Sequence, residues 1–524
     1  MPSPDSSPTS LWRPLRSPTF RNLLIADVVS DVGTFMQSVG AAWLMVSLNA
    51  GPMYVALTQT ASALPYFVLA LPAGAIGDIV DRRKLILTTE IWMLIIALVL
   101  AVITLAGWIS PLVLLALTFA LSAGDAFETP TWRAVIPELV HKDDLAAASA
   151  LNGIEFNFAR AVGPALAGVV IAFRGVGAAF LINTLSFFAV ILVVARWKRA
   201  VVRRATPAET VSGATVAAIR YVRYSPAIRA VLLGAGAAMF FASALMALLP
   251  SIAHRVNGSP LGYGTLLGCF GSGAVLGALA MQRARARWTT DVVVSGGIAI
   301  FGLVTVAAGE LHAMLLLGPL MLIGGAAWTS FISLFNVQVL NQAPDWVRAR
   351  VLAVSMLVFQ GAVAAGSATW GGIAARIGIG KALLFAGVGG VASIVLGWFL
   401  RVPDASLDLT PWNHWRLPAI APVDVDAGGP VLVTVEYHVK PDHVSEFIRT
   451  MHLYGRVRRR DGASRWGICR DLEAADRYLE TFVVSSWAEH LRQHDRFTRA
   501  DRQLEERLNK CAVKEPTVRH LIYL

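Results

Sequence analysis

The sequence predicts an all-α membrane protein with twelve transmembrane helices, followed by a small α+β domain. Composition supports the membrane part, because 56% of the 524 residues are hydrophobic and only 15% are charged, whereas soluble domains carry about 25% charged residues. Apolar runs of membrane-spanning length follow one another between residues 20 and 401. After Arg401 the chain becomes polar and rich in charge, so residues 431–524 are predicted to lie outside the bilayer.

Twelve apolar runs are long enough for a helix that crosses a bilayer, which needs about 20 residues. They are residues 20–47, 54–76, 85–107, 111–132, 145–173, 177–197, 228–253, 261–282, 291–309, 311–336, 348–376 and 379–401. Residues 20–197 form an N-terminal six-helix half and residues 228–401 a C-terminal six-helix half. Residues 1–19 are rich in Pro and Ser and lack the core of a signal peptide, so we expect a disordered cytoplasmic N-terminus.

The net charge of +11 could indicate a nucleic-acid partner, but the basic residues lie in short loops between apolar runs. Arg82–Lys84 and Arg196–Arg204 are examples. Short loops rich in Lys and Arg stay in the cytoplasm, so both termini are predicted there, with the helices in the lipid bilayer of the inner membrane and no nucleic acid bound. Residues 198–227 are an inter-half linker whose basic stretch could lie as an interfacial helix.

The two halves repeat at an offset of 203 residues. The offset pairs Gly74 with Gly277, Arg82 with Arg285, Gly163 with Gly366 and Gly168 with Gly371. One offset that serves two distant regions indicates six helices plus six helices, related by an axis along the membrane normal. Asp78 has no acidic counterpart, because Met281 stands at the paired position.

The turn between the second and third runs contains Gly74, Asp78, Arg82 and Arg83. Their spacing resembles the loop signature between helices 2 and 3 of the major facilitator superfamily, with Asp81 where that family often has Gly. The resemblance implies a gating or structural role for the four residues, with small residues letting two helices approach closely. The alternative is any hairpin that keeps positive charge inside.

The fifth run carries a second motif, Gly163, Pro164 and Gly168. A Gly-Pro step removes a backbone hydrogen bond and permits a kink, and small residues allow close packing, which we expect against the eighth or the second run. The motif resembles the GP-containing signature of exporters and antiporters in the superfamily. Its alternative is ordinary packing of small residues.

Ionisable side chains inside membrane helices cost roughly 2.5–3.5 kcal/mol each and usually face a cavity or a partner. Asp27 and Asp31 share one face of the first run, and Asp125 and Glu128 share one face of the fourth. The resemblance to the superfamily implies that the first, fourth and fifth helices line the cavity of the N-terminal half. Asp31, nearest the middle of the membrane, is the first candidate for binding a proton or a cationic group.

The fifth run adds Glu155 and Arg160 to this set. A structural alternative pairs Glu128 and Glu155 with Arg133 or Arg160 near the inner face. Proton-coupled exporters of the superfamily often have an Arg in the outer half of the fourth helix, where this sequence has none. A carboxylate could still carry the proton.

Amide side chains in apolar helices need partners, so Gln37 and Gln360 are further candidates for contact with substrate. Packing is the alternative for both. The three cysteines offer neither a disulfide framework nor the spacing of a metal site. We therefore expect no cofactor, no metal and no catalytic residue in the membrane part.

The C-terminal region follows a linker, residues 402–430, that is rich in Pro. Residues 431–524 show the order β-α-β-β-α-β, which predicts a ferredoxin-like domain with one long second helix over residues 487–510. His490 and His494 lie one turn apart on that helix. This spacing suits a metal site, but no third ligand is evident, so a solvated or dimer-facing pair is favoured.

Longer stretches extend the resemblance. AFETPTWRAVIPELV in the fourth run and LNGIEFNFARAVGPALAG in the fifth are similar to the transmembrane secretion effector branch of the superfamily, which includes the enterobactin exporter. YLETFVVSSWAEHLRQH is similar to the C-terminal domains of some members and resembles antibiotic-biosynthesis-monooxygenase-like domains, which pair into dimers.

The resemblance implies a secondary transporter that exports a small amphiphilic molecule, such as a siderophore, antibiotic or drug, by alternating access coupled to protons. One alternative is a transporter fused to a ligand-sensing or monooxygenase-like domain that acts on the same molecule. Another is an importer, which the Gly-Pro motif disfavours. No phosphate-binding loop is present, so we expect no ATPase activity.

Overall fold

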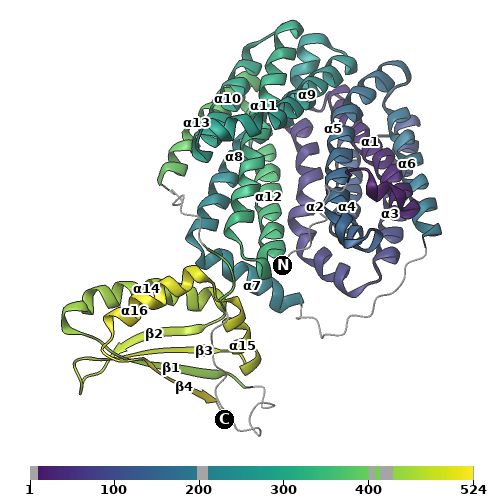
Figure 1. Ribbon diagram of the computed structural model, residues 1–524. Helices are drawn as coiled ribbons and strands as arrows, with labels where there is room; N and C mark the ends of the chain where they lie inside the picture. Colours follow the sequence, from purple (N-terminus) through teal and green to yellow (C-terminus); the bar gives the residue numbers. More distant parts are fainter. Residues whose placement is uncertain (1–9, 198–210, 400–407, 413–428, 523–524) are drawn as a thin grey trace. The chain divides into compact units, whose positions relative to one another are not determined.

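A computed structural model of the protein describes residues 10–197, 211–399, 408–412 and 429–522 (Figure 1). The chain forms two compact units. The first unit contains residues 1–207, 233–335 and 356–399. The second contains residues 208–232, 336–355 and 400–524, so the ends of three helices from the membrane part belong with the C-terminal domain.

The described residues contain long helices that match the predicted runs, each within a few residues. The helices are α1 (Pro18–Ser47), α2 (Gly51–Ile79), α3 (Arg82–Leu105), α4 (Pro111–Leu139), α5 (Leu145–Arg174), α6 (Val176–Arg196), α8 (Pro226–Asn257), α9 (Pro260–Arg287), α10 (Thr290–Glu310), α11 (Met314–Gln342), α12 (Asp345–Ile377) and α13 (Ile379–Phe399). Among the described residues, eleven helices are long and apolar enough to cross a membrane, and α13 carries a shorter apolar stretch. The expectation of a mostly helical membrane protein is confirmed.

Glycine closes most of the turns at one end of this helix array. Gly51, Gly107, Gly175, Gly258 and Gly378 all have positive φ between 61° and 92°, a region that residues with a Cβ rarely adopt. We call this end of the helices the glycine end. The opposite end carries the Arg82–Lys84 cluster and is called the basic end.

Close helix packing in the N-terminal half depends on small residues of α1. The helix lies against α5 on one side and α6 on the other. A Cβ at Gly33 would meet Asn183 and Ser186 of α6 at 2.6 Å, and a Cβ at Gly40 would meet the ring of Phe180 at 2.9 Å. The glycines therefore let α1 and α6 approach more closely than larger side chains permit.

The two halves touch each other toward the glycine end. The Trp43 ring of α1 stacks with Tyr263 of α9 at a centroid distance of 6.3 Å. Thr60 of α2 donates a hydrogen bond to the carbonyl oxygen of Ala364 in α12 at 3.0 Å. A Cβ at Gly264 would lie 2.8 Å from the Cα of Gly168 in α5, so α5 and α9 pack backbone to backbone.

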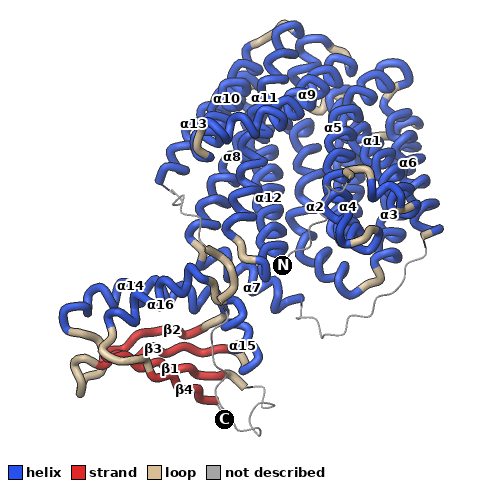
Figure 2. Tube along the Cα trace, viewed as in Figure 1, coloured by secondary structure: helices blue, strands red, loops and turns tan. Residues whose placement is uncertain are grey.

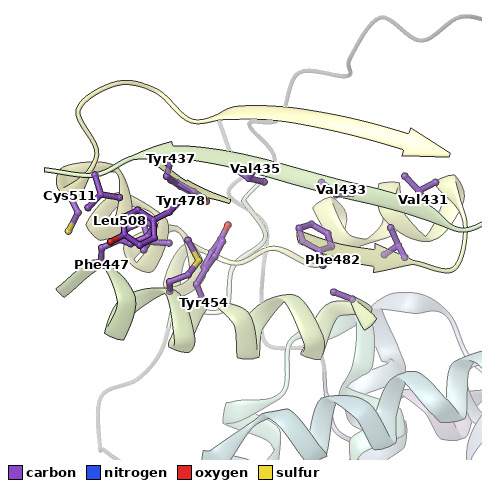
Figure 3. Close-up of a cluster of buried hydrophobic side chains, with 14 residues drawn as sticks. Val431, Val433, Val435, Tyr437, Phe447, Tyr454, Tyr478, Phe482, Leu508 and Cys511 are labelled. Atoms are coloured by element: carbon purple, nitrogen blue, oxygen red, sulfur yellow. The ribbon is translucent and has the colours of Figure 1, made fainter. Parts of the chain in front are cut away.

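The C-terminal domain is a four-stranded antiparallel sheet covered by helices (Figure 2). Its strands are β1 (Val431–His438), β2 (Ser464–Arg470), β3 (Arg477–Val484) and β4 (Thr517–Ile522), in the order β2-β3-β1-β4. Alternate residues of β1 are buried, as expected for a strand with one face in a core. Figure 3 shows this core, in which Tyr437, Phe447 and Phe482 pack between the sheet and α14 (Val444–Asp461).

The prediction of one long helix over residues 487–510 is wrong. The chain forms two helices there, α15 (Trp487–Arg496) and α16 (Arg499–Cys511). Thr498 has extended backbone and starts α16 with a capping box, in which its hydroxyl accepts from the Asp501 amide and Asp501 accepts from the Thr498 amide. The cap provides hydrogen bonds that compete with a continuous helix, a local signal that periodicity alone does not show.

Helix α7 (Val211–Tyr224) lies in the inter-half linker, where the sequence allowed an interfacial helix. In the second unit it packs against α14 of the C-terminal domain. Tyr221 is buried there, with its hydroxyl donating to the Gln342 carbonyl oxygen at 3.3 Å and its ring edge on Trp346. Protein rather than a lipid surface therefore covers this side of α7.

Candidate functional site

Buried and half-buried acidic side chains gather in one region of the N-terminal half. They come from four helices and are Asp27 and Asp31 of α1, Glu90 of α3, Asp125 and Glu128 of α4, and Glu155 of α5. With a rise of about 1.5 Å per residue, each lies roughly 12–21 Å from the basic end of its helix. The helices thus bring the acids that the sequence singled out into one part of the N-terminal half, and they add Glu90.

Asp31 and Glu155 bring α1 and α5 together at their carboxyl groups. The two side chains are in hydrogen-bonding contact, although both are acceptors when ionised. Glu155 is only 4% exposed, and no donor reaches its buried Oε1. Two carboxyl groups in contact need a proton or a cation between them, so this pair can bind positive charge.

Asp27 lies beside that pair, one helical turn from Asp31. It is within electrostatic range of Asp31, Glu155 and Glu128, and it accepts a hydrogen bond from the indole of Trp132 in α4. The indole gives Asp27 a partner that the other two carboxyl groups lack. This contact links Asp27 to the α1–α4 packing.

Asp125 is held by hydroxyl groups rather than by a base. The Tyr66 hydroxyl of α2 donates to its Oδ2, and the Thr129 hydroxyl donates to its Oδ1 at 3.0 Å. Tyr66 could not be singled out from the sequence, because tyrosine is common in membrane helices. Its position one residue after Pro65 gave no chemical signal.

The structural alternative for the acids pairs them with arginines, and the described residues do not show those pairs. No ion pair joins Glu128 to Arg133 or Glu155 to Arg160 in the part of the chain that the structure describes. Arg133 is exposed and Arg160 is half-buried. Among the described residues, hydroxyl groups and the indole of Trp132 are therefore the hydrogen-bond donors that reach these acids.

Gln37 serves packing between helices. Its side chain is 4% exposed and accepts a hydrogen bond from the Asn183 amide of α6. The amide oxygen of Gln37 is therefore used within the α1–α6 contact. Gln360 is half-buried on α12.

The basic cluster caps the ends of neighbouring helices. Arg82 donates to the carbonyl oxygen of Ala134 at 2.6 Å and to Glu138 at 2.7 Å, both in the last turns of α4. Arg83 donates to two carbonyl oxygens at the end of α6. Positive charge at the C-terminal ends of helices is stabilising, so these arginines tie α3 to α4 and α6.

The remaining residues of that turn differ from expectation. The prediction of close approach at Gly74 is wrong, because nothing lies within 4 Å of a Cβ built there. Asp81, where the superfamily often has Gly, caps α3 by accepting from the Lys84 amide at 3.0 Å. The side chain of Asp78 lies outside the described residues.

The Gly-Pro motif of α5 packs as its small residues predict. Gly163 faces α1, where a Cβ would meet Phe35 at 2.6 Å. Gly168 faces α9, the eighth predicted run, where a Cβ would meet the Pro260 carbonyl oxygen at 3.2 Å. Pro164 lies between them, and its carbonyl oxygen would be 2.9 Å from a Cβ at Gly264. The expected contact with the eighth run is confirmed.

An apolar groove of about 440 Å³ lies beside α1 between α5 and α6. Val29, Leu166 and Leu185 line it, and all three are exposed. The lining residues that α1 contributes, such as Val29, Val32 and Met36, lie on the face of α1 away from Asp27 and Asp31, by the 100° rotation per residue of an α-helix. The groove is therefore separate from the acidic residues.

The C-terminal domain contains a histidine cluster rather than a solvated pair. His490 is 1% exposed, and its Nε2 lies 3.0 Å from Nε2 of His520 and 3.4 Å from Nε2 of His494. Burial lowers the pKa of His490 to about 4 and that of His494 to about 3. Within the described residues no group of His, Cys, Asp or Glu has the geometry to hold a metal ion.

Residues 9–524 match the transmembrane secretion effector family. The chain belongs to this family of the major facilitator superfamily. It is therefore a multi-pass membrane protein and a secondary transporter, and the family identified is not an enzymatic one.

Relatives of known or assigned role are distant. The staphyloferrin A transporter of Staphylococcus aureus is 26% identical over 164 residues, which cover 31% of this chain and 41% of the relative. The multidrug efflux pump Tap of Mycolicibacterium fortuitum is 25% identical over 349 residues, which cover 63% of this chain and 83% of the pump. The match to the first relative thus spans about two fifths of its length.

Solved structures support the transporter fold. One of them is a bacterial homologue of the human lysosomal transporter Spinster, in an inward-facing and unoccupied conformation. It superposes with a TM-score of 0.57 at 15% identity, and the match covers 76% of this chain and 96% of the homologue. The POT family transporter PepTSo superposes with a TM-score of 0.60 at 11% identity, and the match covers 73% of this chain and 97% of that one. The resemblance to the major facilitator fold is thereby confirmed.

Proposed function

We propose that this transporter exports a small amphiphilic molecule across the inner membrane and that Asp31 and Glu155 carry the coupling proton. The contact between these two carboxyl groups is the observation on which the proposal rests. They lie in apolar helices with no arginine paired to them among the described residues. A siderophore, antibiotic or drug is the substrate class that the staphyloferrin A transporter and the multidrug pump suggest.

The proposed transport cycle follows from the charge on the carboxyl groups of Asp31 and Glu155. With the pair protonated, the carboxyl groups are joined by a hydrogen bond and α1 can remain against α5. Release of the proton leaves two like charges in contact, which favours their separation or the entry of a cationic group. Proton binding and substrate binding at the same pair would then exclude each other, as an antiporter requires.

The contacts between the two halves suggest to which side of the membrane this conformation of the transporter opens. The halves meet toward the glycine end through Trp43, Tyr263 and the Gly168–Gly264 contact. With the basic end in the cytoplasm, as the distribution of Lys and Arg predicts, closure at the glycine end corresponds to an inward-facing transporter. Both chain termini would then lie in the cytoplasm.

The experiment uses the full chain in proteoliposomes that contain a pH-sensitive dye. A panel of siderophores and cationic drugs is added to wild type, to Asp31→Asn and to the control Asp291→Asn, which changes an exposed carboxylate at the start of α10. We expect proton movement with a subset of compounds in wild type and in the control only. Equal proton movement in Asp31→Asn would contradict the assignment of Asp31.

A second proposal concerns the C-terminal domain, which we infer to be a ferredoxin-like module that senses the transported molecule. The strand order β2-β3-β1-β4 supports the ferredoxin-like assignment. Sensing is favoured over catalysis because the domain contacts α7 and the turn between α11 and α12. Arg460 of α14 lies over the Tyr221 ring at 5.4 Å, and Arg496 of α15 lies over Trp346 at 4.7 Å.

The test compares compounds identified in the proteoliposome screen. Full-length protein is incubated with each compound in detergent, and both binding and chemical conversion are measured. A sensor domain predicts a second binding event, beyond that of the transport site, which is lost after Arg496→Ala and occurs without conversion of the compound. Turnover of the compound would instead support the monooxygenase-like alternative.

A further inference from the structure

Helix α7 has two faces with different surroundings. Ala218 and Tyr221 are buried on the side that packs against α14 of the C-terminal domain. On the opposite side, Val216 is 57% exposed and Ile219 is 48% exposed. Arg223 follows Ile219 by four residues, so it lies on that same side and is also exposed. We call the surface formed by Val216, Ile219 and Arg223 the outer face of α7, and it is both apolar and basic.

The end of α7 lies beside the start of a membrane-spanning helix. Only Ser225 separates α7 from α8, which begins at Pro226 and is long and apolar enough to cross a bilayer. The residue before a proline disfavours helical backbone, so the chain can change direction at Ser225. With a rise of about 1.5 Å per residue, Ile219 lies roughly 10 Å from the start of α8. The outer face is therefore within reach of the lipid headgroups around α8.

The charge of this region fits an anionic surface. The sequence from Thr210 to Thr290 contains no acidic residue, whereas Arg223 and Arg229 are exposed on either side of the joint between α7 and α8. Neither arginine forms an ion pair in the part of the chain that the structure describes. Arg223 lies over the ring of Tyr224 at 5.9 Å, and tyrosine is common at the membrane–water interface. The joint thus has the residues of an interfacial anchor.

A bilayer surface fits the outer face better than a soluble protein does. Its apolar part consists of two side chains, Val216 and Ile219, whereas a stable protein interface buries about 800 Å² on each partner. An amphipathic helix at a membrane needs only a shallow apolar face and basic residues that reach the headgroups. The cytoplasmic leaflet also attracts basic segments next to a spanning helix, because it carries anionic lipid.

We propose that the outer face of α7 binds anionic phospholipid, with Arg223 on the phosphate groups, and that α7 thereby holds the C-terminal domain at the membrane surface. The helix then joins two partners. Val216 and Ile219 enter the headgroup boundary on one side, and Tyr221 lies under Arg460 of α14 at 5.4 Å on the other. Binding of lipid by α7 depends neither on the exported molecule nor on the carboxyl groups that are proposed to carry the proton.

Hydrogen exchange of full-length protein in nanodiscs measures the effect of lipid charge. Discs of phosphatidylcholine are compared with discs that also contain phosphatidylglycerol. Wild type is measured beside Arg223→Gln and the control Arg470→Gln, which changes an exposed arginine at the end of β2. We expect the amides of residues 211–224 to exchange about fivefold more slowly in the anionic discs, the effect of one arginine at such a surface. Arg223→Gln should lose most of this difference, and the control should keep it.

Both leaflets of a nanodisc carry the same lipids, so this result does not depend on which end of the helices is cytoplasmic. Arg223 is exposed, and the exchange of the β1 amides reports whether Arg223→Gln keeps the fold of the domain. Equal α7 exchange in the two kinds of disc, with the β1 amides still protected, would overturn the binding of anionic lipid.

Fluorescence quenching locates the outer face directly. A bimane label is attached at Ile219→Cys or at the control Leu472→Cys, a fully exposed position after β2. Both changes are made in a chain whose Cys269, Cys469 and Cys511 are replaced by alanine. We expect spin-labelled lipid to quench the label at Ile219→Cys more strongly than iodide in solution does, and the reverse at Leu472→Cys. Quenching of Ile219→Cys by iodide alone would show that the outer face is in water or on a soluble partner, and would overturn the proposal.

Discussion

Asp31 and Glu90 illustrate how far chemistry could be inferred from single side chains. The rule that intramembrane acids face a cavity or a partner selected Asp31 and Glu155, and the structure brings these two into contact. The same rule applies to Glu90, within the run LILTTEIWML, although the third run is not among the helices that the resemblance places around the cavity. Applying the rule to every run would have found it.

The histidine cluster of the C-terminal domain leads to a prediction about pH. Because the pKa of His490 is lowered to about 4, the unfolded chain binds a proton near pH 6.5 that the folded domain does not accept until about pH 4. Stability is therefore lost as the pH falls from about 6.5 to about 4, by up to about 1.4 kcal/mol per pH unit. Above pH 6.5 the histidine has no such effect.

The measurement is hydrogen exchange of the β1 and β3 amides in full-length protein, corrected for the intrinsic pH dependence of exchange. His490→Gln should reduce the loss of protection at acidic pH, whereas His452→Gln, at an exposed position of α14, should not. Identical acid profiles for wild type and His490→Gln would contradict the explanation.

The bounds of helices and the contacts between them can be predicted only in part from a single sequence. The twelve runs and the small-residue motif of α5 could be read from composition and spacing, because spanning length and glycine packing are local properties. The break between α15 and α16 could not be read from periodicity, since one capping residue decides it. The contact of α7 with α14 depends on tertiary structure and also lay beyond the sequence.

The α5–α9 contact predicts a strong effect of a small substitution. In Gly264→Ala the added Cβ would lie 2.8 Å from the Gly168 Cα and 2.9 Å from the Pro164 carbonyl oxygen, so the helices must move apart. We expect destabilisation of about 1–3 kcal/mol, the usual cost of overpacking. Thermal unfolding in detergent measures this cost.

Gly153→Ala is the matched control on α5, because no atom lies within 4 Å of a Cβ at that position. It should unfold at the wild-type temperature or slightly above it, since alanine favours helix. Equal unfolding temperatures for Gly264→Ala and the control would show that α5 and α9 are not in backbone contact.

The contact of the C-terminal domain with α7 depends on Arg460. This arginine pairs with Asp461 at 2.8 Å and with Asp501 at 2.7 Å while covering the ring of Tyr221. Arg460→Ala would leave two buried carboxylates without their partner, at a cost of about 3–5 kcal/mol. We expect faster hydrogen exchange in α7, residues 211–224, of the full-length protein.

Arg502→Ala is the control, because Arg502 forms pairs with Glu505 and Glu506 on a more exposed part of α16. Such pairs contribute about 0.3–0.5 kcal/mol, so α7 exchange should stay at the wild-type rate. Unchanged α7 exchange in Arg460→Ala, with the amides of β1 still protected, would show that α7 is not held by the domain.

For the whole transporter, the sequence predicts the fold more completely than it predicts the substrate. Repeat, topology signals and apolar runs are distributed over hundreds of residues, so they predicted the major facilitator fold that the solved structures support. Substrate choice depends on a few side chains whose positions follow from packing. Gln37 shows this, since its amide is used by Asn183 within the helix array.

The central claim is that the Asp31–Glu155 pair couples transport to protons. Once a substrate is known, proteoliposomes allow two assays of Asp31→Asn, exchange of labelled for unlabelled substrate and uphill transport driven by a proton gradient. Exchange needs the alternating conformations and the binding site, whereas uphill transport also needs the coupling proton.

The decisive measurement is therefore uphill transport by Asp31→Asn in vesicles where exchange is intact. We expect exchange within about threefold of wild type and uphill transport reduced at least tenfold, a loss of about 1.4 kcal/mol or more in coupling. Uphill transport by Asp31→Asn at the wild-type level, with an unchanged dependence on the proton gradient, would contradict the central claim.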